Sequence, residues 1–260
     1  MESVLELQNL RAGYGGDDVL KGISVSQARG RNLCVLGPNG SGKSTLLKVL
    51  AGVLPYEGSA LICGEEIAAM KRRELSRQVA LMGQLEGAAF PYSVYETVLL
   101  GRYGRSKRGL FSGWTEEDRA AAEEYLRETD LWELRETPII ELSGGQLQRV
   151  FFARTLVQEP SVILLDEPTN HLDLRYQAEL LRLLLDWSRR EGHSLVGVLH
   201  DINMALQLAD DLLLLKEGEV AAFGPAEDVL TPALLEKVYG IDVAGYMAGA
   251  LRRWQQIEEG

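Results

Sequence analysis

The sequence predicts an α/β fold with a mixed, largely parallel core sheet, an N-terminal antiparallel β subdomain and a helical subdomain. Three observations predict it: apolar and polar residues alternate near the N-terminus, three short continuous apolar runs follow, and helical patterns come after those runs. With 260 residues, 46% of them apolar, the chain is long enough to bury a large core.

The N-terminal part has the pattern of an antiparallel sheet. Apolar and polar residues alternate over 5–8 and again over 23–26. A period of two places the apolar side chains on one face of a strand, so these segments are expected to be half-buried strands.

The core strands are predicted from apolar runs without alternation. These runs are Leu33–Leu36, Val162–Leu165 and Leu195–Leu199. Strands that read this way are usually buried on both faces, as in a parallel sheet covered by helices.

Helices are expected after the core strands and in the middle of the chain. Leucines recur at helical spacing between 46 and 54, and a second such pattern runs over about 174–190. Residues 91–160 read as helical without a convincing strand and form the predicted helical subdomain. Within them, Thr115 and Asp118 have the spacing of a capping box.

The C-terminal part is expected to hold a hairpin and two short helices. Lys216–Glu219 reads as a turn between two apolar runs, and Pro225 and Pro232 each open a helical pattern. We expect one domain over residues 1–240 and a tail over 241–260, in which Trp254 packs on the body or on a second subunit.

Composition and charge exclude several classes of protein. With 27 Lys and Arg against 38 Asp and Glu, the net charge is −11, which argues against nucleic acid or an anionic lipid surface as the partner. The longest apolar runs have four residues, whereas a membrane-spanning helix needs about 20. The N-terminus does not read as a signal peptide, and Cys34 and Cys63 read as small core residues of a reduced, cytosolic protein.

A phosphate-binding loop is the most specific motif. The segment from Gly37 to Ser44 matches G-x-x-x-x-G-K-[ST], between a predicted buried strand and an amphipathic helix. Glycines let backbone N–H groups approach a phosphate closely, Lys43 adds a cation, and the Ser44 hydroxyl suits Mg²⁺. The predicted nucleotide-binding residues here are Gly37, Pro38, Asn39, Gly40, Ser41, Gly42, Lys43, Ser44 and Thr45.

Two carboxylates follow the predicted strand at 162–165. Asp166 stands at its carboxyl end, where open α/β sheets place their ligands, and can hold Mg²⁺. Glu167 can orient or deprotonate an attacking water. The alternative is an Asp-Glu pair that merely ends a strand and starts a turn.

A second anion site is predicted at the start of another helix. Ser143, Gly144, Gly145 and Gln146 precede a helical run, so a helix N-terminus presents free N–H groups and a hydroxyl. Taken alone, the segment could be an ordinary Ser/Gly helix cap.

Together, the loop at 37–44, the Leu142–Gln146 segment and Asp166-Glu167 resemble the ATP-binding cassette (ABC) ATPases in order and spacing, over about residues 3–240. The resemblance implies a P-loop NTPase fold of the ABC cassette type that binds ATP and Mg²⁺ and hydrolyses ATP. It implies that Ser143–Gln146, the signature of one subunit, closes on the ATP held by a second copy, so that a homodimer encloses two nucleotides.

The resemblance also assigns single residues. Tyr14 is similar to the aromatic residue that stacks on adenine, and His200 to the histidine that hydrogen-bonds the γ-phosphate. Asp173 belongs to the loop that crosses to the partner's site. Gln84 is similar to the glutamine that touches Mg²⁺ and water, so Ser44, Gln84 and Asp166 are the implied metal ligands, and Glu167, His200, Lys43 and Gln84 the implied catalytic residues.

Longer matches resemble the ATPases of iron(III)–siderophore, haem and cobalamin importers, as at 167–173 and 224–230. Such a subunit works on the cytoplasmic face of the membrane with two permease subunits and, indirectly, a substrate-binding protein. Residues 85–115, with the basic stretch Arg102–Arg108, are a candidate permease-docking surface or a solvated loop. Alternatives are a soluble non-transport ABC ATPase, an importer of another chelate or of molybdate, or a small-molecule kinase. The sequence does not reveal the cargo.

Overall fold

The computed structural model describes residues 2–83, 91–105, 113–170 and 172–258, which form two sheets with helices packed on them. The first sheet is antiparallel, with the strand order β2-β1-β4-β5. Its strands are β1 (Ser3–Gly13), β2 (Asp18–Ala28), β4 (Glu57–Ile62) and β5 (Glu65–Glu66). The alternation at 5–8 and 23–26 correctly predicts β1 and β2, whereas β4 and β5 were not predicted.

The second sheet has the order β10-β9-β3-β8-β7-β6. All its neighbours are parallel except β9 and β10, which form the hairpin predicted from the turn at 216–219. Its strands are β3 (Leu33–Leu36), β6 (Val79–Met82), β7 (Val162–Asp166), β8 (Ser194–Val198), β9 (Asp211–Lys216) and β10 (Glu219–Pro225). The three runs predicted as buried strands are β3, β7 and β8, so the mixed α/β fold class is confirmed.

Helices cover both faces of this second sheet. The α-helices are α1 (Lys43–Leu50), α2 (Arg72–Gln78), α3 (Val94–Leu99), α4 (Glu116–Glu128), α5 (Gly144–Leu156), α6 (Leu174–Ser188), α7 (Ile202–Leu208), α8 (Ala226–Val229), α9 (Pro232–Tyr239) and α10 (Val243–Glu258). Short 3₁₀ helices are η1 (Ile67–Ala69), η2 (Leu100–Gly104), η4 (Trp132–Leu134) and η5 (Ile139–Glu141). None of the helices within the described ranges has the length and hydropathy needed to cross a bilayer.

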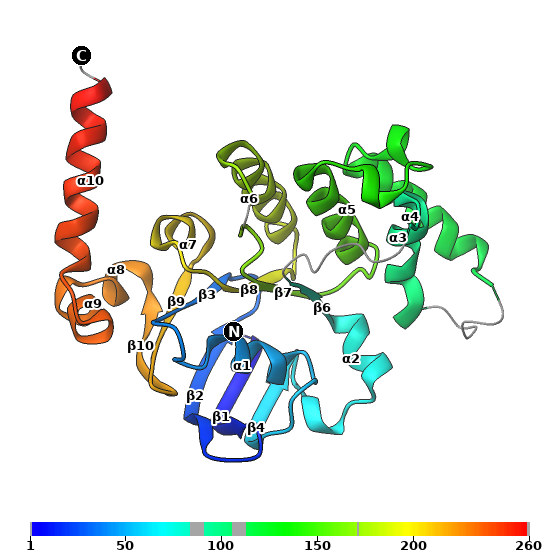
Figure 1. The fold of residues 1–260 in the computed structure, drawn as a ribbon. Helices are drawn as coiled ribbons and strands as arrows, with labels where there is room; N and C mark the ends of the chain where they lie inside the picture. The colour runs from blue at the N-terminus through cyan, green and yellow to red at the C-terminus, as the bar shows by residue number, and fades with distance from the viewer. Residues whose placement is uncertain (1, 84–90, 106–112, 171, 259–260) are drawn as a thin grey trace.

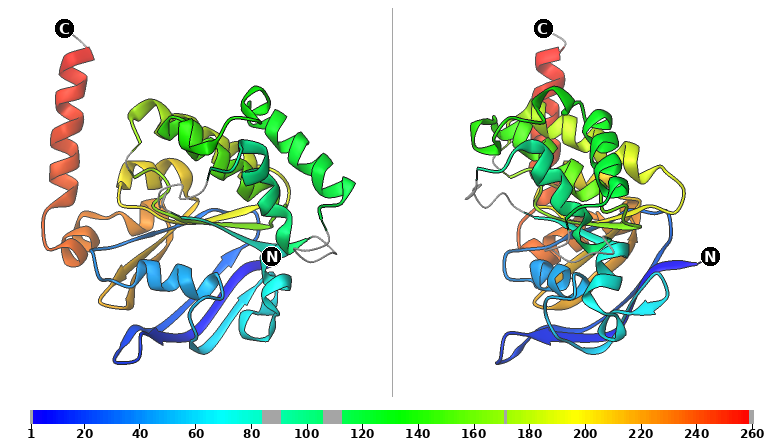
Figure 2. Two further views of the ribbon diagram at one scale, coloured as in Figure 1. Left: turned by 45° about the vertical axis from the view of Figure 1, so that its right-hand side comes forward. Right: turned by 90° about the vertical axis from the view of Figure 1, so that its right-hand side faces the viewer.

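The layers follow from which face of the second sheet each helix covers (Figures 1 and 2). Helix α1 touches strands of both sheets, whereas α5, α6 and α7 lie on the opposite face of the second sheet. Helices α3 and α4 pack with α5 into a separate apolar cluster. Of the residues described between 91 and 160, none lies in a named strand, although Ser93 and Pro138 form an isolated bridge.

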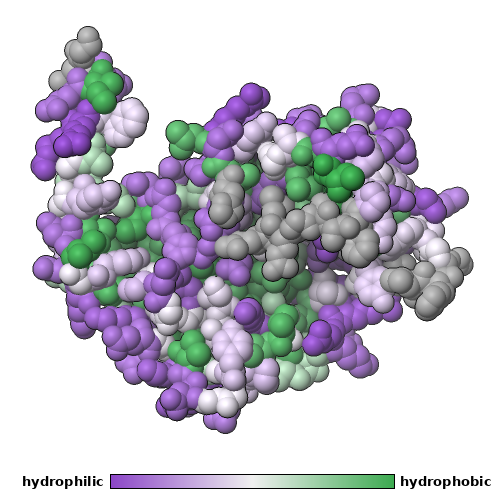
Figure 3. Space-filling view, viewed as in Figure 1, coloured by the Kyte–Doolittle hydropathy of each residue, from purple (hydrophilic) through white to green (hydrophobic). Residues whose placement is uncertain are grey.

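The C-terminal tail forms a helix that stands clear of the body (Figures 1 and 3). Trp254, which was expected to pack on the body or on a second subunit, is 68% exposed. The first of these two alternatives is therefore wrong in this structure, because the helix carries Trp254 away from the sheets.

In the N-terminal part of the chain, α1 ends at Leu50, so Leu54 lies beyond the helix that it was predicted to join.

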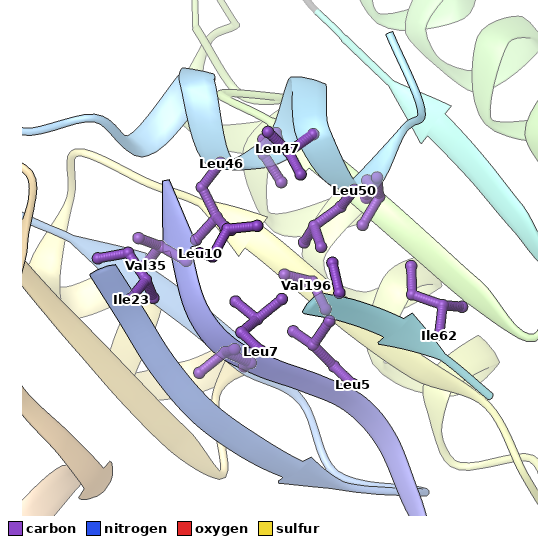
Figure 4. Packing of buried hydrophobic residues seen from close by; sticks show 14 of the residues in the cluster. Leu5, Leu7, Leu10, Ile23, Val35, Leu46, Leu47, Leu50, Ile62 and Val196 are labelled. Carbon is purple, nitrogen blue, oxygen red and sulfur yellow. The ribbon is translucent and has the colours of Figure 1, made fainter. Parts of the chain in front are cut away.

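The main core lies between the two sheets (Figure 4). Leu46, Leu47 and Leu50 of α1 project among side chains of β1, β2 and β4 on one side and of the second sheet on the other. All three leucines are almost fully buried, and burial of such a side chain contributes roughly 1.5–3 kcal/mol. The start of α1, and the loop before it, are thereby fixed against the carboxyl end of β3.

Candidate functional site

The loop between β3 and α1 has a shape that only glycine permits at two positions. Gly37 and Gly42 have φ angles of 149° and 101°, which L-residues rarely adopt. A Cβ atom on Gly37 would lie 2.2 Å from the Leu215 carbonyl oxygen, and one on Gly42 would lie 2.7 Å from Leu20 Cδ2. The loop is therefore pressed against the body while its open side leads into the N-terminus of α1.

The inside of this loop is polar and incompletely hydrogen-bonded. Lys43 Nζ donates to the carbonyl oxygens of Gly37 at 2.8 Å and Pro38 at 3.0 Å. Burial lowers the pKa of Lys43, and the nearby Glu167 and Asp166 carboxylates oppose this shift. The buried Ser41 hydroxyl has no hydrogen-bond partner among the described residues. A cation and an unsatisfied hydroxyl facing a glycine loop fit an anion such as a phosphate.

Oxygen atoms suited to a divalent cation lie beside the loop. The Ser44 hydroxyl hydrogen-bonds to Asp166, which ends β7. Burial, followed by the adjacent Glu167 carboxylate, raises the pKa of Asp166, while Lys48 and the Ser44 hydrogen bond act against this shift. A half-buried carboxylate that is costly to ionise gains from a cation, and hydroxyl and carboxylate oxygens are the ligands that Mg²⁺ prefers.

Glu167 is held by partners from two elements. Its φ angle is 52°, in the left-handed region, and its backbone N–H donates to Val198 O of β8 at 3.1 Å. One carboxylate oxygen hydrogen-bonds to His200 Nε2, and the other accepts from Asn170 Nδ2. The left-handed backbone of a non-glycine residue indicates strain that the surrounding structure maintains. Asn170 was not predicted, because only the turn after β7 brings it back to Glu167.

The signature segment forms a helix cap with exposed N–H groups. Ser143 caps α5: its hydroxyl accepts from Gln146 N at 3.3 Å, and Gln146 Oε1 accepts from Ser143 N at 3.0 Å. Ser143 and Gly144 are exposed, so the first turn of α5 is open to an anion. Gly145 is buried, and a Cβ atom there would lie 2.0 Å from the Tyr176 ring.

The signature helix is tied to the loop that follows Glu167. Gln148 is almost fully buried, and its Nε2 donates to Pro168 O at 2.7 Å. Asp173 caps α6 by accepting from Tyr176 N at 3.0 Å. Arg149 of α5 pairs with Glu179 of α6 at 2.8 Å. Sequence reasoning missed Gln148, because its role depends on the packing of α5 against the Asp166–Asp173 segment.

The remaining predicted residues have different outcomes. Tyr14 is 58% exposed, with Lys48 Nζ over its ring at 5.2 Å from the ring centre and its hydroxyl 3.5 Å from Thr45 Oγ1, so it lies beside the start of α1. Gln84 lies outside the described residues. The structure thus brings Lys43, Ser44, Asp166, Glu167 and His200 to one end of the second sheet, while Ser143–Gln146 and Asp173 lie at the starts of α5 and α6.

The basic stretch expected at a docking surface is partly internal. Arg102 is 4% exposed and pairs with Asp118 at 3.2 Å and Glu159 at 3.2 Å, and Arg105 also pairs with Glu159. These two arginines join η2 to α4 and to the end of α5. The docking expectation is wrong for the buried Arg102, whereas Arg105 is partly exposed and its docking role stays a prediction. Residues 106–108 of the stretch lie outside the described residues.

Comparisons with known proteins agree with this geometry. Residues 20–170 match the family described as ABC transporter. The chain is 37% identical over 243 residues to the ferric enterobactin transport ATP-binding protein FepC of Escherichia coli (strain K12), covering 92% of this chain and 89% of FepC. It is 39% identical over 240 residues to the uncharacterized ABC transporter ATP-binding protein YvrA of Bacillus subtilis (strain 168), but it spans only 54% of that protein's length.

A solved structure supports the same assignment. A metal-chelate type ABC transporter in an inward-facing conformation superposes with a TM-score of 0.80 at 30% identity, covering 93% of this chain and 90% of that one. The matched family residues, the relatives and the fold are consistent with one another. The chain therefore belongs to the ABC transporter family, as an ATP-binding subunit that couples ATP hydrolysis to transport.

Proposed function

We propose that this chain powers an importer of a metal chelate, an iron(III)–siderophore, haem or cobalamin. FepC, which bears the name of a ferric enterobactin transporter, is similar over almost its whole length, and the solved neighbour is a metal-chelate type transporter. The observation that carries the ATPase role is the glycine loop at 37–42, with the buried cation of Lys43 and the unsatisfied hydroxyl of Ser41.

Two separate anion sites on one chain support a dimer as the active form. The loop before α1 and the exposed start of α5 each present N–H groups to an anion, yet they belong to different parts of the chain. We propose that ATP held by Lys43 in one copy is closed off by Ser143, Gly144 and Gly145 of a second copy. A two-fold dimer then contains two such sites, because the contact is self-complementary.

Mg²⁺ fits beside the loop, where Ser44 and Asp166 would hold it, with Gln84 as the third proposed ligand. When bound, Mg²⁺ supplies positive charge that stabilises the phosphate oxygens during transfer. The raised pKa of Asp166 supports this proposal, because a carboxylate that burial destabilises is stabilised by a cation.

The chain's own residues provide the chemistry of hydrolysis. Lys43 would exchange its two carbonyl partners for phosphate oxygens, which are stronger acceptors. Glu167 would accept a proton from the attacking water. His200 and Asn170 hold the two oxygens of Glu167 in place, so the base is oriented before the substrate arrives. Tyr14 would stack on the adenine ring and Asp173 would contact the opposite site.

The proposal places the protein at the cytoplasmic face of the membrane. We propose that two permease subunits form the transport path, because the chain is similar to an ATP-binding protein of a transport system and to a chain of a solved transporter. A substrate-binding protein would deliver the chelate to them. Nucleic acid is not among the proposed partners, because the net charge is −11.

The test is the substitution Glu167→Gln, with Glu191→Gln on an exposed turn as the matched control. We expect Glu167→Gln to lower ATP turnover by about 10²–10⁴-fold while retaining ATP. With ATP and Mg²⁺ it should elute as a dimer in size-exclusion chromatography, whereas Glu191→Gln should behave like the natural chain. A Glu167→Gln protein that stays monomeric with ATP and Mg²⁺ would contradict the closure mechanism.

The cargo needs the intact complex. The complex should be isolated from its native membrane, its permease identified, and its ATP turnover measured with and without the iron(III) chelate and binding protein. Stimulation by the chelate supports the metal-chelate proposal. Stimulation by an oxyanion alone, or a complex that lacks any permease, would support the alternatives instead.

A further inference from the structure

The C-terminal helix α10 has an apolar stripe that the body covers only at its base. Val243 belongs to the buried apolar cluster that also contains side chains of α6, α7 and α9, and Met247 packs against that cluster. Farther along, Tyr246, Leu251, Trp254 and Ile257 are 60–74% exposed. Figures 1 and 2 show that the helix continues away from the body, so the other described residues leave the outer part of the stripe uncovered.

The stripe has the spacing of a two-stranded coiled coil. Val243, Met247, Ala250, Trp254 and Ile257 are separated by four, three, four and three residues, which is the a/d repeat of a heptad. A groove runs along the helix over Gly249, between Tyr246 and Arg253, and offers space for a side chain of a partner helix. The opposite face of α10 contains Ala248, Arg252 and Gln256, which are small or polar, so the stripe is confined to one face of the helix.

The residues beside the stripe favour a parallel pair of identical helices. In a parallel pair, the residue just before position a on one helix contacts the residue just after position d on the partner helix, five places farther along the sequence. Arg253 and Glu258 are five residues apart and have opposite charges. Tyr246 and Leu251 are also five apart and are both apolar in character. Both flanking contacts are therefore complementary in the same register, and each would occur twice in a two-fold pair.

We propose that the exposed part of α10, residues 246–258, pairs in parallel with the same helix of a second copy of this chain. A parallel pair has a two-fold axis along the helices, as a closed homodimer requires. The helix pairing does not depend on the proposed function, but its consequence does: a pair of C-terminal helices would hold two ATPase subunits together while their nucleotide sites open. Gly245 and Gly249 weaken the isolated helix, so a partner along the stripe also stabilises it.

A membrane surface fits the stripe less well. Helices that lie on anionic membranes have many cations on their polar face, whereas α10 has only Arg252 and Arg253 among its described residues and has Glu258 beside the stripe. The chain as a whole is strongly acidic, which further opposes an anionic lipid surface.

The first test is oxidative cross-linking of the full chain at two neighbouring positions. Ile257→Cys lies on the stripe and should form a disulfide with its twin in nucleotide-free protein, because parallel helices bring identical positions together. Gln256→Cys is exposed on the opposite face and is the control, with the same native cysteines present. Equal cross-linking at the two positions, or faster linking at 256, would overturn the proposal.

The second test is a charge swap between the flanking residues, measured by analytical ultracentrifugation. Arg253→Glu and Glu258→Arg should each weaken self-association about fivefold, since two ion pairs are lost in a symmetric dimer. The double variant should recover it, because it restores the pairs in the same register. Failure of the double variant to recover would exclude the parallel register.

A third measurement separates the competing occupants and the two proposals. If vesicles of phosphatidylcholine with phosphatidylserine capture the chain in flotation, and Trp254→Glu abolishes this while the cross-link is absent, a membrane covers α10 and the pairing proposal is wrong. The nucleotide sites are tested independently by the gain in self-association that ATP and Mg²⁺ give Glu167→Gln over its own nucleotide-free form, since helix pairing is expected without nucleotide. A missing 257–257 cross-link in a protein that still shows this gain therefore rejects the helix pair alone.

Discussion

The contact between the signature helix and α6 gives a sharp prediction at two adjacent glycines. A Cβ atom on Gly145 would lie 2.0 Å from Tyr176 Cδ1, whereas ordinary van der Waals contact begins near 3.4 Å, so the ring must retreat by 3.4 − 2.0 = 1.4 Å. Tyr176 also donates its backbone N–H to the Asp173 cap of α6. We therefore expect Gly145→Ala to disturb both the start of α5 and the Asp173 turn.

The size of the effect follows from overpacking. Forcing a methyl group into such a contact costs about 1–3 kcal/mol. The matched control is Gly144→Ala, because a Cβ atom at Gly144 meets no atom within 4 Å and alanine favours a helix over glycine by up to about 1 kcal/mol. Because Gly145 also lies in α5, alanine gains the same helix preference at both positions, and the free energies of unfolding of the two variants should differ by the overpacking cost alone, roughly 1–3 kcal/mol, measured by urea denaturation of nucleotide-free protein.

A double-mutant cycle identifies the contact responsible. If the clash with the ring is the cause, Gly145→Ala should cost much less in a Tyr176→Ala background, because the ring is absent. The coupling free energy should then be at least about 1 kcal/mol. Equal stability of Gly144→Ala and Gly145→Ala, or a cycle with no coupling, would refute this account of the packing.

Three further predictions concern the charged residues. Lys43→Ala should lose most affinity for ATP in equilibrium binding, and unchanged affinity would refute its assignment to the phosphate. Asp166→Asn should raise the unfolding midpoint at neutral pH, because burial raises the pKa of Asp166 and its ionised carboxylate therefore destabilises the fold above that pKa. The gain should vanish in acid, where the aspartic acid and the asparagine side chains are both neutral. An equal gain at all pH values would contradict this. The hydrogen bond from Arg31 lowers the pKa of Asp211, so this pair stabilises the fold above the ordinary aspartate pKa, and the stabilisation is lost as pH falls through the lowered pKa. Arg31→Met should therefore lower the free energy of unfolding at neutral pH, by at most about 1 kcal/mol because the Arg31 side chain is 42% exposed. A difference that persisted in strong acid would argue against this pair.

Local patterns were sufficient for many elements. The run Leu33–Leu36 is fully buried in β3, and Thr115 and Asp118 form the predicted capping box at the start of α4. These signals succeed because strand alternation, apolar runs and helix caps depend on residues close in the chain. Strand β4 was missed, because its Glu-Gly-Ser start has no apolar alternation, and it forms only by pairing with β1.

Long-range contacts decided the residues that sequence reasoning missed or misplaced. Arg102 reads as part of a basic surface, yet Asp118 and Glu159, 16 and 57 residues farther along, make it an internal ion-pair centre. Asn170 and Gln148 read as ordinary polar residues until the turn after β7 and the packing of α5 bring them against Glu167 and Pro168. Their spacing alone gives no signal, because the bonds depend on how separate elements pack.

The sequence by itself determined the family, the nucleotide loop and several of the strands and helices, since each of these depends on short contiguous motifs whose chemistry is local. Only the tertiary structure decided which side chains satisfy Glu167, that Ser41 remains without a partner among the described residues, and that α10 leaves its stripe open. Burial and hydrogen-bond satisfaction are properties of surfaces brought together in space, and no contiguous stretch of the chain encodes them.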